Sequence, residues 1–376
     1  MKYYLIAGEA SGDLHASNLM KEIKKLDMHA NFRFWGGELM QSVGGELVKH
    51  YKELDFMGFL EVVKNLKTIL KNLRDCKEDI LNFQADAVIL VDYPGFNLRI
   101  AKFLHQHSIK TYYYISPQVW AWKKNRVHKI CKFSNRVFTI LPFEGDFYKN
   151  YGYEVDYVGH PLLDAIKNRD SSDDNAKRIR KELSLSEKEI IAVLPGSRMQ
   201  EVGKMLPMML NQIKNFPDYQ FVIAAAPHFN EDFFTPFLKR FGEFKVVYNR
   251  TYDVLQIAHT AMVTSGTATL ETALFKVPEV VCYKGSTVSY HIAKKLVDIK
   301  YISLVNLILD KEVVRELIQN ELNDKLLKKE LGKLLRDNDY RSEMINTFES
   351  LIKLLGGGGA SEKTAQLLMS ELKKDV

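Results

Sequence analysis

The chain has 376 residues, more than a single hydrophobic core usually holds, so two domains are expected. Its hydrophobic content of 46% and charged content of 27% are typical of a globular protein with sizeable cores. The net charge of +6 is too mild for a nucleic-acid-binding protein, whose basic residues form denser stripes. It suits an anionic partner such as a sugar nucleotide, a lipid phosphate or an acidic membrane surface.

The first half of the chain alternates short apolar runs with amphipathic stretches, the pattern of a parallel sheet whose strands are joined by helices. The predicted strands cover residues 2–7, 32–35, 87–91, 110–115 and 136–141, and the first predicted helix covers about 12–26. The first strand ends in the loop Gly8–Asp13, which contains Ser11 and Gly12. Backbone N–H groups at such a strand-to-helix turn favour a phosphate.

The stretch from Phe59 to Arg74 has the periodicity of an amphipathic helix. Its apolar stripe consists of Val62, Leu66, Ile69 and Leu73, and its basic stripe of Lys64, Lys67, Lys71 and Arg74. Basic residues opposite an apolar stripe suit a membrane surface. A core-facing helix with a solvated basic face explains the same spacing, and the residues alone favour that simpler interpretation.

Asp92 directly follows the apolar strand 87–91. Ligands of open α/β sheets bind at the carboxyl ends of strands, so Asp92 is placed to act as a general base. The alternative is that it caps a turn or a helix.

The run from Tyr113 to Lys123 begins in the next predicted strand, continues beyond its end and is unusually aromatic. Gln118 and Trp120 suit sugar recognition through hydrogen bonding and stacking, although an aromatic core loop would also explain them. Arg126 follows on the next predicted helix, where it could reach an acceptor phosphate.

The polar segment from Asp164 to Asn175 marks the predicted domain boundary. Strands are predicted again at 190–194, 221–225, 245–247, 261–263 and 280–283, and from Lys311 onward the chain is expected to be helical. Four glycines at 356–359 separate this helical stretch from a last helix at the end of the sequence. We therefore expect an N-terminal domain over 1–168, a C-terminal domain over 169–350, and a helix within 351–376 that packs back on the first domain.

Two glycine loops of the second half suit a nucleotide diphosphate. One follows strand 190–194 and contains Gly196, Ser197 and Arg198, whose guanidinium supplies a fixed positive charge. The other follows strand 261–263 and contains Ser265, Gly266 and Thr267 at a helix start.

Glu271 lies one turn beyond the second loop, where its carboxylate could bind a ribose diol. A capped helix start is the alternative for that segment. Neither loop has the GxGxxG spacing of nicotinamide and flavin enzymes. The predicted fold is α/β, with two Rossmann-like parallel-sheet domains facing a cleft.

The sequence offers no sign of a metal or a cofactor. Cys76, Cys131 and Cys282 are far apart and read as reduced cytosolic thiols, and the histidines show no paired ligand spacing. No apolar stretch approaches the roughly 20 residues that span a bilayer, and no secretory segment is evident. We expect a cytoplasmic protein whose membrane contact is peripheral.

Taken together, these motifs resemble the lipid-A-disaccharide synthase family over nearly the whole chain. The resemblance rests on Gly8–Asp13, Ser116–Trp122, Val158–Pro161, Leu194–Arg198 and Ser265–Glu271. It implies a GT-B glycosyltransferase, inverting and metal-independent, that joins UDP-2,3-diacylglucosamine to 2,3-diacylglucosamine 1-phosphate and releases UDP. It also implies work at the inner face of the cytoplasmic membrane, which makes the Phe59–Arg74 helix a predicted membrane contact.

The resemblance also assigns roles to residues. Asp92 would be the base, Arg198 and the Ser265–Thr267 loop would hold the leaving diphosphate, and Glu271 would bind ribose. The first glycine loop, Gln118, Trp120 and Arg126 would bind the sugar or the acceptor. The same role falls to Asn306, Glu316 and Gln319, although the surrounding residues depart from the family pattern because Val305 and Arg315 stand where proline is usual.

Two other functions remain open from the sequence. A UDP-sugar epimerase would share the nucleotide loops, and a catalytically inactive lipid- or nucleotide-binding protein would share the fold. Product formation with and without an acceptor would separate them. The sequence leaves the oligomeric state open, with a homodimer as one option.

Overall fold

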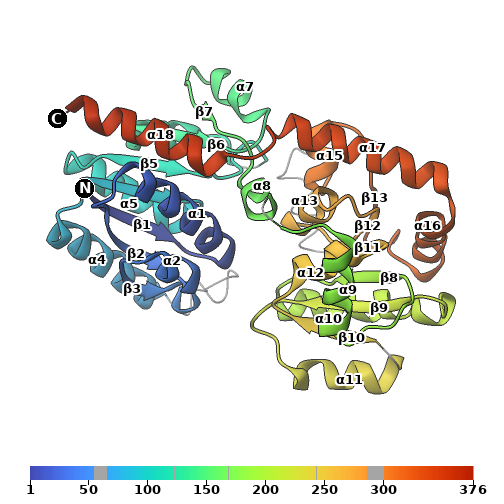
Figure 1. Ribbon diagram of the computed structural model, residues 1–376. Helices are drawn as coiled ribbons and strands as arrows, with labels where there is room; N and C mark the ends of the chain where they lie inside the picture. Colours follow the sequence, from blue (N-terminus) through green and yellow to red (C-terminus); the bar gives the residue numbers. More distant parts are fainter. Residues whose placement is uncertain (55–65, 122, 168, 243, 286–299, 376) are drawn as a thin grey trace. The chain divides into compact units, whose positions relative to one another are not determined.

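The computed structural model describes residues 1–54, 66–121, 123–167, 169–242, 244–285 and 300–375. The chain forms two compact units: Met1–Asn168 with Leu355–Val376, and Arg169–Leu354. Each unit is built on one parallel sheet (Figure 1). The predicted α/β fold with two parallel-sheet domains is therefore confirmed, whereas the cleft between them stays a prediction.

The first unit has a seven-stranded sheet in the order β3-β2-β1-β4-β5-β6-β7, with every neighbouring pair parallel. Its strands are β1 (Lys2–Ala7), β2 (Asn31–Gly36), β3 (Glu46–His50), β4 (Ala87–Val91), β5 (Thr111–Tyr114), β6 (Arg136–Thr139) and β7 (Asp156–Tyr157). Its helices are α1 (Ala10–Leu26), α2 (Glu38–Val43), α4 (Leu66–Phe83), α5 (Pro94–Gln106), α6 (Arg126–Phe133), α7 (Glu144–Lys149), α8 (Pro161–Ile166) and α18 (Ala360–Leu372). Because parallel strands share one direction, the residues that follow β1, β4, β5 and β6 meet at one edge of the sheet.

Each face of this sheet carries its own core. Along β1, Tyr3 and Leu5 pack toward α1 and α18, whereas Tyr4 and Ile6 pack toward α4, α5 and α6. The alternation follows from the two-residue period of a strand that is buried on both faces. The sequence of β4 is accordingly apolar throughout.

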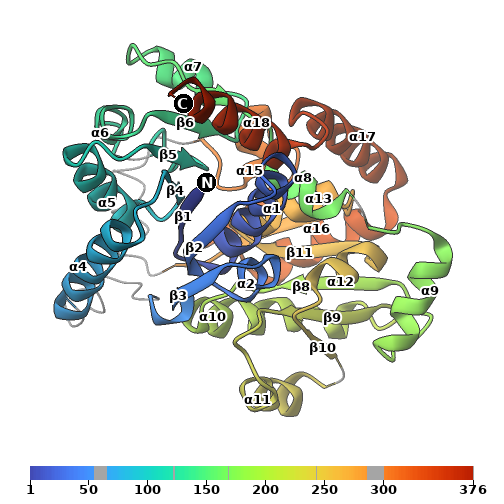
Figure 2. The ribbon, with the colours of Figure 1, turned by 60° about the vertical axis from the view of Figure 1, so that its left-hand side comes forward.

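Helix α18 brings the end of the chain back to the first unit, where it lies beside α1 (Figures 1 and 2). Its first turn is held by Asp164 of α8, whose carboxylate accepts hydrogen bonds from the backbone N–H groups of Gly359, Ala360 and Ser361. A carboxylate at a helix N-terminus satisfies N–H groups that have no partner within the helix.

The second unit has a six-stranded parallel sheet in the order β10-β9-β8-β11-β12-β13. Its strands are β8 (Ile190–Leu194), β9 (Gln220–Ala225), β10 (Lys245–Tyr248), β11 (Thr260–Thr264), β12 (Glu279–Tyr283) and β13 (Arg315–Ile318). Its helices are α9 (Asp173–Glu182), α10 (Met199–Leu210), α11 (Glu231–Phe241), α12 (Thr251–Ile257), α13 (Thr267–Leu274), α15 (Leu304–Leu309), α16 (Asp324–Arg336) and α17 (Asn338–Leu354).

The expectation of continuous helix from Lys311 onward is wrong at one place. Residues Arg315–Ile318 form β13, which pairs with β12 in parallel. This strand has four residues and begins with the charged Arg315 and Glu316, so it is too short and too polar for sequence periodicity to reveal it. Pairing with β12 decides its conformation.

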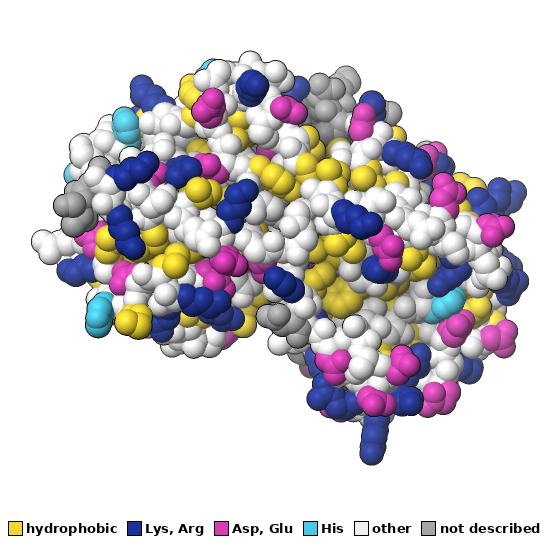
Figure 3. All heavy atoms as spheres, turned by 45° about the horizontal axis from the view of Figure 1, so that its top comes forward, with side chains coloured by type: hydrophobic (Ala, Val, Ile, Leu, Met, Phe, Trp, Pro, Cys, Tyr) yellow, Lys and Arg dark blue, Asp and Glu magenta, His cyan; other side chains and the backbone are white. Residues whose placement is uncertain are grey.

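Surface charge is mixed in this structure. On the face drawn in Figure 3, Lys and Arg side chains are interspersed with Asp and Glu. Within the described residues, none of the helices combines the length and the apolarity that crossing a membrane requires.

Candidate active site

Asp92 lies at the carboxyl end of β4, in a turn that fixes its backbone. Asp92 and Tyr93 both have left-handed backbone angles, with φ of 43° and 47°. The Asp92 carbonyl accepts hydrogen bonds from the Tyr113 hydroxyl (2.7 Å) and from Asn97 Nδ2 (2.8 Å). Its N–H donates to the Tyr114 carbonyl at 3.1 Å. Neighbouring elements thus hold a conformation that a non-glycine residue adopts at some cost, which is common at functional sites.

The surroundings of the Asp92 carboxyl raise its pKa, which makes it a stronger base. Burial raises its pKa to about 7, the negative charge of Glu9 adds to this effect, and the N–H of Tyr93 opposes it. Glu9 follows β1, which is the neighbour of β4 in the sheet. A carboxyl with a pKa near 7 is a far stronger base than an exposed one and is still substantially ionised at neutral pH.

The loop after β1 lies next to this turn. Any Cβ on Gly8 would come within 2.4 Å of the Tyr93 ring, so only glycine fits that contact. Ser11 is exposed, whereas Gly12 is buried against Ala7.

The buried carboxylate of Asp13 accepts hydrogen bonds from the N–H groups of Gly37, Leu39 and Met40. It therefore holds the start of α2, and its predicted role in binding the acceptor stays a prediction. Gly12 likewise serves packing in this structure.

The segment after β5 reaches the same sheet edge. Gln118 is exposed, and Trp120 is 9% exposed with its ring edge-on to Phe143 at 5.0 Å. The Ser116 and Tyr148 hydroxyls lie 2.6 Å apart and tie this segment to α7. Trp122 lies outside the described residues.

Arg126, at the start of α6, is close enough to Tyr113 to lower the pKa of that hydroxyl, which burial and Asp92 raise. Two predicted residues, Asp92 and Arg126, thus share Tyr113 as a neighbour. Tyr113 opens the aromatic run noted in the sequence, but no local pattern indicates its hydrogen bond to the Asp92 carbonyl.

Glu144, at the start of α7 beyond β6, is a further buried carboxyl that was not predicted from the sequence. Its carboxylate accepts hydrogen bonds from the N–H groups of Ile140 and Leu141. Burial raises its pKa to about 7, those N–H groups and Trp120 lower it, and Asp92 raises it further. Unlike Asp92, it does not directly follow its strand, because β6 ends at Thr139.

In the second unit, the loop from Gly196 to Arg198 joins β8 to α10. Gly196 has φ of 105°, a left-handed conformation that favours glycine. Ser197 and Arg198 are exposed. Their backbone N–H groups lower the pKa of the Glu201 carboxyl, which burial raises, and Glu201 was not among the predicted site residues.

The second glycine loop of this unit joins β11 to α13. Gly266 has φ of 149°, and the Ser265 hydroxyl donates to the Ile302 carbonyl at 2.9 Å. Glu271 accepts a hydrogen bond from the Tyr252 hydroxyl at 2.8 Å, and burial raises the pKa of its carboxyl. Tyr252 thereby orients Glu271, and nothing in the local sequence indicates that contact.

Asn306 and Glu316 form a buried hydrogen-bond network. Asn306 Nδ2 donates to Glu316 Oε1 (3.0 Å) and to the Val314 carbonyl. Its Oδ1 accepts from the N–H groups of Val313 and Val314. The Glu316 carboxylate also accepts from the N–H of Ile302 and of the residue after it.

These bonds connect α15 to β13 and give Asn306 and Glu316 a structural role, and their predicted contact with the sugar stays a prediction. Gln319 follows β13 with φ of 52°, and its buried Nε2 has no hydrogen-bond partner in the described part of the chain. It remains a candidate for contact with a ligand.

The predicted membrane contacts also need correction. Leu73 is 6% exposed and belongs to the core beneath α4, and Ile69 packs against the same core. Val62 and the Leu66 side chain lie outside the described residues. Of the predicted stripe, Ile69 and Leu73 therefore face the core of this unit and not a membrane.

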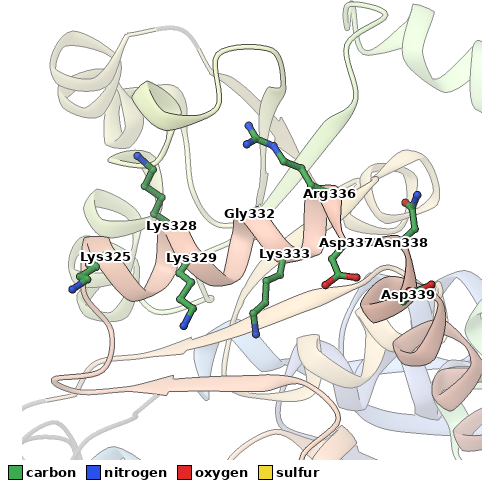
Figure 4. Close-up of a pocket in the computed structure, with 9 residues that line it drawn as sticks. All are labelled: Lys325, Lys328, Lys329, Gly332, Lys333, Arg336, Asp337, Asn338 and Asp339. Carbon is green, nitrogen blue, oxygen red and sulfur yellow. The ribbon is translucent and has the colours of Figure 1, made fainter.

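A hollow of about 930 Å³ lies along α16 (Figure 4). Its lining is strongly basic but includes none of the predicted site residues, and consists of Lys325, Lys328, Lys329, Gly332, Lys333, Arg336, Asp337, Asn338 and Asp339. The cations spread to opposite sides of the helix, with Lys328 and Arg336 on one side and Lys329 and Lys333 on the other (Figure 4). They do not converge on one ligand position.

Among the described residues, no group of three or more His, Cys, Asp or Glu side chains is arranged to hold a metal ion. Each unit thus carries candidate site residues of its own, carboxyls in the first unit and glycine loops with Arg198 in the second.

Comparison with known proteins identifies relatives along the whole chain. A family model described as lipid-A-disaccharide synthetase matches residues 3–369. The lipid-A-disaccharide synthase of Geobacter sulfurreducens is 33% identical over 99% of this chain and 97% of its own length. That of Coxiella burnetii (strain CbuK_Q154) is 35% identical over 97% and 96%, respectively.

Solved structures share the fold at low sequence identity. UDP-GlcNAc 2-epimerase from Neisseria meningitidis, bound to UDP-GlcNAc, has a TM-score of 0.67 with 12% identity, over 98% of this chain and all of that one. The glycotransferase of kitacinnamycin has a TM-score of 0.65 with 11% identity, over 99% of both chains. These structures show the architecture alone.

Proposed function

Because the chain belongs to the lipid-A-disaccharide synthetase family, and is thus a glycosyltransferase of lipid A biosynthesis, we propose that it joins UDP-2,3-diacylglucosamine to 2,3-diacylglucosamine 1-phosphate. The products are the β-1′,6-linked disaccharide 1-phosphate and UDP. The whole-chain family match carries this proposal. It favours the transferase over an epimerase, since the epimerases share only the fold.

Asp92 is the proposed general base. Its carboxylate removes the proton of the acceptor 6-hydroxyl while that oxygen attacks the anomeric carbon of the donor, and the bond from that carbon to the diphosphate breaks on the opposite face. The pKa of about 7 supports this assignment, because the ionised form is available at neutral pH and is basic enough to accept a proton. The geometry of the reaction inverts the anomeric centre.

The second unit is the proposed donor site. Negative charge grows on the leaving diphosphate during the reaction. It is stabilised by the backbone N–H groups of the Gly196–Arg198 and Ser265–Thr267 loops and by the positive charge of Arg198. Glu271, oriented by Tyr252, binds the ribose diol. Arg126 and Gln118 remain proposed contacts of the acceptor, and Trp120 lines the same region.

Peripheral contact with the inner face of the cytoplasmic membrane is also proposed, through the outer face of α4. This face carries Lys67, Lys71 and Arg74, and Leu70 is 57% exposed beside them. Basic side chains around an exposed leucine suit an anionic lipid surface. The oligomeric state stays a prediction, with a homodimer as one option.

The direct test is incubation of the purified protein with UDP-2,3-diacylglucosamine, with and without 2,3-diacylglucosamine 1-phosphate, in detergent and EDTA. We expect a tetra-acyl disaccharide phosphate by mass spectrometry only when the acceptor is present. UDP release or sugar isomerisation without acceptor would instead indicate hydrolysis or epimerase chemistry. Loss of turnover in EDTA would contradict metal independence.

A further inference from the structure

The carboxylate of Glu201 lies inside the proposed diphosphate loop. A Cβ placed on Gly196 would be only 2.3 Å from Glu201 Oε2, so the carboxylate packs directly on the glycine backbone. The backbone N–H groups of Ser197 and Arg198 are near enough to this carboxyl to lower its pKa. Glu201 therefore lies at the donors that a bound diphosphate would need.

Charge strengthens this competition. The Arg198 guanidinium is near enough to Glu201 to lower the pKa of its carboxyl, which burial raises. One cation and two N–H groups thus interact with an anion supplied by the protein itself. A diphosphate and a carboxylate present similar oxygens to such donors, so both cannot occupy them fully at once.

We propose that Glu201 is an internal competitor of the donor diphosphate, holding the Ser197 and Arg198 donors until the diphosphate displaces it. This inference rests on the proposed function, because it takes the Gly196–Arg198 loop as the diphosphate site. Displacement makes binding of UDP and of the donor weaker than the loop alone would allow. Return of the carboxylate to the loop assists release of UDP after the transfer.

If Glu201 has a simpler, purely structural role, the opposite change in UDP affinity is expected. A glutamate in the first turn of α10 whose carboxyl lies near the N–H of Arg198, the residue before the helix, is half of a capping box. If Glu201 only supported the loop, its removal would loosen the loop and weaken the binding of UDP. The sign of the change in affinity therefore separates the two roles.

The experiment measures UDP binding to the full chain by calorimetry for wild type, Glu201→Gln and Glu201→Ala. Gln removes the charge but keeps an oxygen for the two N–H groups, and Ala removes the competing oxygen as well. Glu231→Gln is the matched control, since Glu231 is an exposed acid in the first turn of α11, in the same unit. Melting temperatures establish that each variant is folded.

We expect both Glu201 variants to bind UDP more tightly, on the order of three- to tenfold, with a smaller gain at high salt. The Glu231→Gln control should bind UDP as the wild type does. Unchanged or weaker binding in a folded Glu201→Gln protein would overturn the inference.

Arg198→Gln distinguishes that failure from failure of the proposed site. If Arg198→Gln weakens UDP binding while the Glu201 variants show no gain, the donor site stands and the competitor role is wrong. If Arg198→Gln leaves UDP binding unchanged, the loop is not the diphosphate site, and both the site and the inference fail.

Discussion

The two units use the same parallel-sheet plan, yet the residues beyond their strands differ in chemistry. In the first unit, Glu9, Asp92 and Glu144 follow β1, β4 and β6 and bring carboxyl groups to one edge. In the second unit, glycine loops follow β8 and β11 and carry backbone N–H groups with Arg198. One edge is suited to accept a proton, and the other to hold an anion.

The difference arises from what surrounds each edge. Burial and neighbouring acids raise the pKa of Asp92 and Glu144 to about 7, which favours their protonated forms. Ser197 and Arg198 are exposed, and the left-handed Gly196 between them and β8 turns the chain sharply. The sheet thus decides where a site lies, and the few residues after each strand decide its chemistry.

The strongest test of this division is Asp92→Asn. We expect kcat to fall by about 10²- to 10⁴-fold, because the amide cannot take up the acceptor proton. UDP affinity should stay at the wild-type value, since that site belongs to the second unit. Asp146→Asn, an exposed change in the same unit, is the control. Near-normal turnover of a folded Asp92→Asn protein would remove Asp92 from the mechanism.

The converse change is Arg198→Gln in the second unit. We expect about 10- to 100-fold weaker UDP binding by calorimetry, the usual size for loss of charge-assisted hydrogen bonds to a diphosphate. Arg198→Lys should recover only part of it, because a lysine cannot reproduce the planar fork. Arg240→Gln, on α11, should have no effect. A comparable loss in that control would indicate a general charge effect.

The pH dependence sharpens the comparison for the first unit alone. The base must be ionised, and the Asp92 pKa is raised to about 7, so kcat/KM should fall about tenfold per unit as the pH drops below 7 and level off above it. Glu9→Gln should move this limb to lower pH, because the Glu9 charge helps to raise that pKa. A wild-type limb that begins only below about pH 5 would argue that Asp92 is exposed or unused.

The smallest expected effect concerns the membrane. Replacing Lys67, Lys71 and Arg74 of α4 by Gln should weaken binding to vesicles rich in anionic lipid by several-fold, up to about tenfold at low salt. Co-sedimentation measures it, with neutral vesicles as a reference. The matched control replaces Lys325, Lys328 and Lys329 on α16 (Figure 4). A larger loss in that control would move the contact to the second unit.

Much of the site follows from local sequence. The apolar runs at 87–91 and 190–194 are the buried strands β4 and β8, since a strand covered on both faces must be apolar throughout. The residues after them were therefore identifiable as Asp92 and the Gly196–Arg198 loop. The Ser265–Thr267 loop was identifiable in the same way, because it follows the buried strand β11.

The hydrogen-bond and packing partners of individual side chains could not be predicted from local sequence patterns. Asp13, Asn306 and Glu316 were predicted to bind the sugar or the acceptor, and in the structure each of them also hydrogen-bonds to backbone groups elsewhere in the chain. Leu73 has the spacing of either a core or a membrane residue, and packing placed it in the core. Periodicity reports which face of a helix is apolar but does not report what covers that face.

By itself, the sequence determined the alternation of strands and helices, the two parallel sheets and the strand ends where chemistry gathers, because these depend on residue periodicity along a few neighbouring positions. Only the tertiary structure decided the pKa of Asp92, the contact of Tyr252 with Glu271 and the contacts of Asp13 with the start of α2. Each of these depends on burial and on groups from elsewhere in the chain, and no local pattern encodes those distances.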